Sequence, residues 1–105
     1  MAVQPLKTPD FDGIIDDAPL AMVDFWATWC GPCRMLGPVI EDLAQQYDGK
    51  ALVAKVNVDE EPSLAGRFGV DSIPTIVFLK HGREFDRKIG AAPAAVFQEV
   101  LDKAL

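Results

Sequence analysis

The chain has 105 residues, half of them hydrophobic (50%), so we expect residues 1–105 to form one domain with a compact core. Its formal net charge of −6 argues against a nucleic-acid groove and against an anionic membrane surface as ligand, because both require clustered lysine and arginine. No apolar run approaches the roughly 18 residues of a membrane span, and the N-terminal residues lack the apolar segment of a signal peptide, so we expect a cytoplasmic protein without membrane contact.

Strands and helices are predicted to alternate along the chain. The continuous apolar run at 20–26 is typical of a central strand that is buried on both faces. Thr8 is expected to cap the first helix, and Pro38 is expected to kink the second. We expect strands over 2–6, 20–26, 52–58, 75–79 and 83–89, and helices over 9–16, 33–47, 61–68 and from 93 onward, with Leu105 on the apolar side of the last helix.

The order of these elements predicts an α/β fold. Strands that alternate with helices imply parallel crossovers, and a hairpin turn at His81-Gly82 adds an antiparallel strand at the edge of the sheet. The expected architecture is therefore a central mixed β-sheet that is flanked by helices on both faces.

The two cysteines of the chain, Cys30 and Cys33, stand at the junction between a buried strand and a helix. A cysteine at a helix start faces unpaired N–H groups and the positive end of the helix dipole, and both favour the nucleophilic thiolate. Cys33 is close enough in sequence to attack a mixed disulfide formed by Cys30. The pair therefore indicates thiol–disulfide exchange.

Three other interpretations of the cysteine pair compete with this one. A structural disulfide across so short a loop would restrict the unfolded chain little. A zinc site needs four ligands, whereas the chain offers two cysteines and the distant His81, so we expect no metal. Inert buried thiols would not need Gly31 and Pro32 between them. Redox chemistry remains the favoured interpretation.

The stretch Trp29-Cys30-Gly31-Pro32-Cys33 resembles the active-site signature of the thioredoxin family, and the resemblance covers nearly the whole chain. It implies a thioredoxin-like fold in which Cys30 is the exposed nucleophile, Cys33 the buried resolving cysteine, and the two form a redox-active disulfide. Trp29, Gly31 and Pro32 complete the active-site loop. Trp29 also offers a flat surface for substrate contact, although it could simply be a core residue.

Asp24 and Lys55 each interrupt an apolar strand. Because burying an unpaired charge is costly, they could form a structural ion pair. Alternatively, burial raises the pKa of Asp24 toward neutrality, where it can exchange a proton with Cys33. Both residues match the buried aspartate and lysine of the family, which implies proton transfer by Asp24 with support from Lys55.

The resemblance also implies a groove for substrate. Ile73-Pro74 matches the family's cis-proline loop, at which the extended backbone of a substrate pairs with residue 73, and Gly90-Ala91 matches the rim of the groove. Without the resemblance, Pro74 is only a residue that precedes a strand, and Gly90 only a turn. Asp71 is a departure, because many relatives carry a basic or neutral residue there, and it places a negative charge near the expected docking surface.

The implied function is the reduction of disulfides in other proteins, as a protein-disulfide reductase, a general cytosolic electron donor and a keeper of cell redox homeostasis. The chain should need no bound cofactor and act as a monomer. A separate thioredoxin reductase, driven by NADPH or linked to ferredoxin, would reduce it again, and the implied clients are ribonucleotide reductase, peroxiredoxin and methionine sulfoxide reductase. Two rivals stay open: an oxidase or isomerase, and a binding subunit whose partner does not use the thiols.

Overall fold

The computed structural model describes residues 3–105, and in this range the elements follow the predicted order. Ala2, which the sequence assigns to the first strand, lies outside the described residues. Several boundaries agree to the residue, such as those of the strands at 20–26 and 83–89. The elements are β1 (Gln4–Pro5), α1 (Thr8–Asp16), β2 (Leu20–Trp26), α2 (Gly31–Gln46), β3 (Leu52–Asn57), α3 (Pro62–Arg67), β4 (Thr75–Lys80), β5 (Arg83–Ile89) and α4 (Ala94–Ala104).

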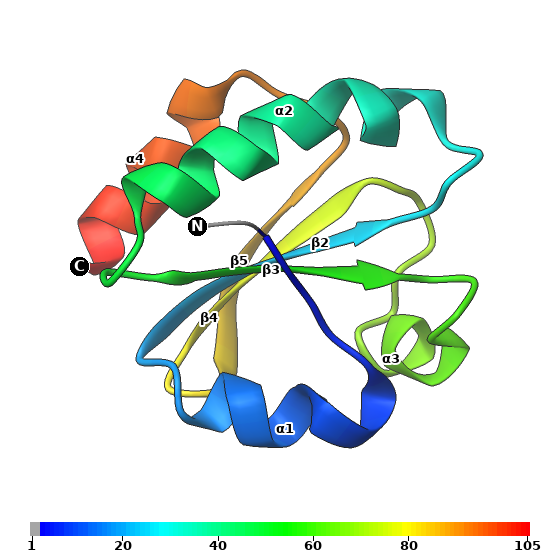
Figure 1. Cartoon of the computed structure of the whole chain (residues 1–105), viewed down its shortest axis with the longest axis horizontal. Coiled ribbons are helices and arrows are strands. Elements are labelled where there is room, and N and C mark those ends of the chain that lie inside the picture. The colour runs from blue at the N-terminus through cyan, green and yellow to red at the C-terminus, as the bar shows by residue number, and fades with distance from the viewer. Residues whose placement is uncertain (1–2) are drawn as a thin grey trace.

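The strands form one mixed sheet in the order β1-β3-β2-β4-β5. β1 and β2 both run parallel to β3, whereas β4 is antiparallel to β2 and β5 is antiparallel to β4. α2 and α4 cover one face of the sheet, and α1 and α3 cover the other (Figure 1). The predicted α/β architecture, a central mixed sheet with helices on both faces, is therefore confirmed.

The central strand β2 supplies apolar side chains to both faces, because successive side chains of a strand point in opposite directions. Met22 packs in the cluster that includes residues of α2 and α4, whereas Val23 and Phe25 pack in the cluster with residues of α1 and α3. The same alternation places Asp24 on the face of Met22, beneath α2. An acidic side chain is thereby buried inside the molecule.

The start of α1 differs from its prediction. Its N-cap residue is Lys7, which makes no capping bond through its side chain, and the helix already begins at Thr8. The backbone N–H and the hydroxyl of Thr8 donate to Glu61 Oε1 at 2.8 and 2.9 Å. The prediction that Thr8 caps this helix was wrong, because a carboxylate from a distant loop accepts the bonds at this helix end.

The last helix also differs at its end. α4 stops at Ala104, and Leu105, which was expected on its apolar side, is 61% exposed. A terminal side chain beyond the last turn has no helical neighbours to hold it against the core.

The hairpin is as predicted, with positive φ at His81 (51°) and Gly82 (80°). Within residues 3–105, no helix has the length and apolar character that crossing a membrane requires.

Candidate active site

Cys30 and Cys33 form a disulfide at the N-terminal end of α2, just beyond the end of β2. Their Cα atoms are 5.2 Å apart. Cys30 is the N-cap residue of α2, so the helix begins two residues earlier than predicted, and its Sγ accepts the backbone N–H of Cys33 at 3.2 Å. In the reduced protein, the same N–H group and the helix dipole would favour a thiolate at Cys30. Pro38 lies inside α2 without ending it.

The exposure of the two sulfur-bearing residues does not follow the prediction. Cys30 was expected to be exposed, but both cysteines are 4% exposed in this disulfide form. The reason is a small apolar cluster around the disulfide, in which Ala27 is buried and Ile73 and Val58 pack against the pair. What distinguishes the two cysteines is therefore their neighbours and not their exposure.

Cys30 lies beside the loop that precedes β4. Its Sγ is 3.8 Å from the carbonyl oxygen of Ile73, and the Ile73–Pro74 peptide bond is cis, as the resemblance implied. The N–H of Gly90 donates to the carbonyl oxygen of Pro74 at 2.8 Å, and the exposed Ala91 follows. Three segments that are distant in sequence thus meet at the Cys30 side of the disulfide.

Trp29 is on the surface next to the disulfide, with 66% of the residue exposed, so it is not a core residue. Its indole N–H donates to Asp59 Oδ2 at 2.8 Å. Pro32 is also exposed, whereas Gly31 is half-buried. Sequence reasoning missed Asp59, and only its place in the acidic turn after a buried strand could have suggested a role.

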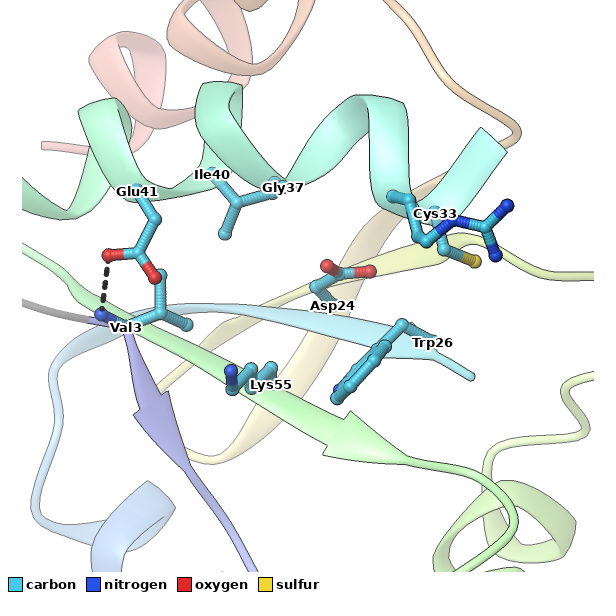
Figure 2. Close-up of a pocket in the computed structure, with 9 residues that line it drawn as sticks. Val3, Asp24, Trp26, Cys33, Gly37, Ile40, Glu41 and Lys55 are labelled. Carbon is cyan, nitrogen blue, oxygen red and sulfur yellow. Dashed lines mark hydrogen bonds between the residues drawn. The ribbon is translucent and has the colours of Figure 1, made fainter. Parts of the chain in front are cut away.

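Cys33 faces inward, toward a cavity of about 130 Å³ beneath α2 (Figure 2). Asp24 also lines this cavity and is 5% exposed. Burial raises the pKa of Asp24 to about 7, and the charge of Lys55 opposes that shift only in part. Asp24 Oδ1 and Trp26 Nε1 are buried without a hydrogen-bond partner among residues 3–105, and both residues line the cavity. The cavity is large enough for water, and a water molecule there would hydrogen-bond to these two atoms.

Lys55 lies opposite Asp24 in the register of β2 and β3, so the two side chains share one face of the sheet. Among the salt bridges of the described residues, however, none joins them. The Nζ atom of Lys55 lies instead 5.2 Å from the ring centroid of Trp26. No direct contact therefore supports the interpretation of Asp24 and Lys55 as an ion pair.

Glu41 is a further acidic residue at the cavity that the sequence did not suggest. It is exposed on α2, and its Oε1 accepts the N–H of Val3 at 3.4 Å, as Figure 2 shows. In the sequence, Glu41 resembles any solvated charged residue on a helix, so no local signal marked it.

Within the described part of the chain, no cluster of three or more histidine, cysteine, aspartate or glutamate side chains is arranged to hold a metal ion.

Comparisons of this chain with known proteins all find thioredoxins. The family model "Thioredoxin" matches residues 2–103. The thioredoxin of Staphylococcus epidermidis is 49% identical over 105 residues and covers 100% of both chains. Thioredoxin 2 of Chlorobaculum tepidum is 52% identical over 90 residues, which are 86% of this chain and 83% of the relative. The structure of a mutant thioredoxin from Halobacterium salinarum superimposes with a TM-score of 0.92 at 33% identity, covering 98% of this chain and 90% of that chain.

Proposed function

The chain belongs to the thioredoxin family, and from this membership and the geometry of its site we propose how it acts on its substrates. It is a thiol–disulfide oxidoreductase, a protein-disulfide reductase that works through the redox-active Cys30–Cys33 disulfide. In the proposed reaction, the thiolate of Cys30 attacks one sulfur of a substrate disulfide. A mixed disulfide forms, and the other substrate sulfur leaves as a thiolate that takes up a proton.

In the second step, the thiolate of Cys33 attacks Cys30 Sγ in the mixed disulfide. The bond between Cys30 and the substrate breaks, the second substrate sulfur leaves and is protonated, and the Cys30–Cys33 disulfide forms. Two electrons pass from the enzyme dithiol to the substrate. The observation that carries these roles is the different surroundings of the two sulfurs: Cys30 adjoins Ile73 at the surface loop, whereas Cys33 lines the inner cavity.

Asp24 is proposed to accept the proton that Cys33 loses before its attack. A carboxyl group whose pKa is about 7 can both accept and release a proton near neutral pH, which an ordinary aspartate cannot. Water in the shared cavity would carry the proton between the two groups. Lys55 supports this role, because its positive charge limits how far the pKa of Asp24 rises.

The substrate is proposed to bind over the Cys30 side of the disulfide. Its extended backbone would pair with Ile73 beside Pro74, while Trp29, Gly90 and Ala91 form the rim of the groove. This proposal is supported by the short distance between Cys30 and Ile73 and by the bond between Gly90 and Pro74, which hold these segments together.

Family membership implies a reductase that restores the dithiol and client proteins that carry disulfides. We further propose that this reductase is a flavoprotein that uses NADPH, and that the clients include ribonucleotide reductase, peroxiredoxin and methionine sulfoxide reductase. The chain would act as a monomer in the cytoplasm. Support for these finer assignments comes from the family resemblance of the active-site sequence alone.

Trapping of mixed disulfides tests the division of labour between the cysteines. Cys33→Ser can still form the mixed disulfide but cannot resolve it, so we expect it to accumulate covalent adducts with disulfide-containing proteins. Cys30→Ser should form none, like the Cys30→Ser/Cys33→Ser control. The measurement is non-reducing electrophoresis followed by identification of the adducts. Equal trapping by both single variants would contradict the assignment.

A further inference from the structure

Asn57, the last residue of β3, organises the loop that follows it. Its side-chain oxygen Oδ1 accepts the backbone N–H groups of Asp59 at 2.9 Å and Glu60 at 3.3 Å. Its backbone oxygen accepts the N–H of Glu61 at 2.9 Å. One residue thus receives three hydrogen bonds from the segment that spans residues 59–61, which we call the acidic loop.

The acidic loop reaches the active site through Asp59. The carboxylate of Asp59 accepts the indole N–H of Trp29, and Trp29 immediately precedes Cys30. With 66% of Trp29 exposed, packing restrains its ring little, so this bond to a charged acceptor is the main polar restraint on its orientation. The orientation of the ring therefore depends on where the loop holds the carboxylate.

We infer that Asn57 is a positioning residue for the reductase reaction. By fixing the backbone of the acidic loop, it places the Asp59 carboxylate so that Trp29 keeps one orientation beside the disulfide. The inference rests on the proposed role of Trp29 in substrate contact. Asn57 itself touches neither sulfur nor substrate in this scheme, and acts only through Asp59 and Trp29.

A purely structural role for Asn57 makes a different prediction. If Asn57 only terminated β3, its replacement would lower the stability of the fold but leave the indole of Trp29 unchanged in the folded protein. The indole N–H is therefore the decisive probe. The chain has two tryptophans, so a Trp29→Phe variant identifies which of the two indole signals belongs to Trp29.

The first measurement is nuclear magnetic resonance of the indole N–H groups in ¹⁵N-labelled protein. In Asn57→Ala, we expect the Trp29 indole proton to move upfield and to exchange faster with solvent, because its bond to Asp59 is weakened. Asn57→Asp retains an acceptor at the same place and should restore the signal. Glu60→Ala is the matched control in the same loop and should leave it unchanged. An unaltered Trp29 signal in a folded Asn57→Ala protein would overturn the inference.

The second measurement is kcat/KM for a disulfide-containing protein and for a small aromatic disulfide. Asn57→Ala should lower kcat/KM for the protein substrate about threefold to tenfold, the scale of one hydrogen bond, and affect the small disulfide less. In an Asp59→Ala background, Asn57→Ala should have no further effect on the protein substrate. A full additional loss there would overturn the inference, whereas failure of the proposed function itself would appear as activity that survives Cys30→Ser.

Discussion

Asp24 shows how one residue can cost stability and still be useful. Successive side chains of β2 point to opposite faces of the sheet, which places the carboxyl group of Asp24 beneath α2. Its Oδ1 has no hydrogen-bond partner among the described residues. Burial disfavours the charged form, so the pKa rises from an ordinary value of 3.8 to about 7. Between these two values, the folded protein holds a proton that the unfolded chain has released. Stability is therefore greatest below pH 4 with respect to this group, and is lost as pH rises toward 7.

We predict that Asp24→Asn is more stable than the wild type at pH 8. The difference should be on the order of 4 kcal/mol at most, since each pKa unit is worth about 1.4 kcal/mol, and should shrink toward zero near pH 4. The variant should also reduce substrates more slowly at the step in which Cys33 attacks. Urea unfolding as a function of pH and single-turnover disulfide reduction measure the two effects.

Asp42→Asn serves as the control for that experiment, because Asp42 is an exposed residue of α2. It should change neither the stability profile nor the rate. An Asp24→Asn protein that is less stable at pH 8 and yet reduces substrate at the wild-type rate would leave Asp24 as a structural group only.

Individual residues were predictable where a local signal marked them. Asp24 stood out as a charge inside an apolar strand, and Cys30 and Cys33 as the two cysteines of the chain. Asp59 and Glu41 carried no such signal, because an acidic residue in a loop or on an exposed helix face is usually solvated. The burial of Cys30 was also beyond sequence reasoning, since its covering residues Val58 and Ile73 come from distant segments.

At the scale of elements, the interiors of β2 and α2 followed from their own apolar patterns, whereas some ends depended on tertiary contacts. The apolar run of β2 marked both of its ends. By contrast, the start of α1 is set by Glu61, which lies 53 residues beyond Thr8. No window around Thr8 contains that partner, which explains why a local cap was predicted in its place.

The contact between Glu61 and α1 predicts a loss of stability in acid. Two hydrogen bonds from Thr8 lower the pKa of Glu61 below its ordinary value of 4.5. The bond from the backbone N–H contributes most, and the bond from the hydroxyl contributes next. The stabilising contribution is therefore fully present above about pH 4.5 and is lost as pH falls through the lower pKa of the folded state. The change of stability with pH that Glu61 causes therefore has the opposite sign to the change that Asp24 causes.

We predict that Glu61→Gln is less stable than the wild type at pH 7, because a neutral amide oxygen is a weaker acceptor than a carboxylate. The two proteins should converge as the pH is lowered below 4. Urea midpoints between pH 3 and pH 7 check this expectation, with Glu60→Gln as the control, because Glu60 lies on the surface. A constant difference between Glu61→Gln and the wild type at every pH would show that the charge of Glu61 does not matter.

At the scale of the whole molecule, the order of elements was enough to predict the α/β class and the mixed sheet. The alternation of strands and helices leaves few topologies, because parallel crossovers must pack helices on the faces of the sheet. The lateral order β1-β3-β2-β4-β5 was not predicted, since hydrophobic patterning says which strands are buried but not which strands are neighbours. The convergence of Ile73 and Gly90 on Cys30 depends on that order, so it was available only through the family resemblance.

The protein has a net charge of −6, and Asp71 contributes a negative charge near the active site. Asp71 is exposed and stands three residues before Pro74, which adjoins the Cys30 side of the disulfide through Ile73. A negative charge there should slow the approach of acidic client proteins and favour basic ones. Because exposed charges are screened within about 10 Å at 0.1 M salt, the effect should depend on ionic strength.

We predict that Asp71→Arg increases the association rate with an acidic disulfide-containing protein about threefold to tenfold at low salt, and decreases it for a basic one. Both effects should disappear near 1 M salt, where the screening length is about 3 Å. Stopped-flow measurement of the first step provides the rates. Asp17→Arg is the matched control, because it changes the net charge equally but lies just before the start of β2, whereas the disulfide follows the other end of that strand. If Asp17→Arg changed the rates as much as Asp71→Arg, overall charge would govern the encounter, and Asp71 would have no special part in the choice of partner.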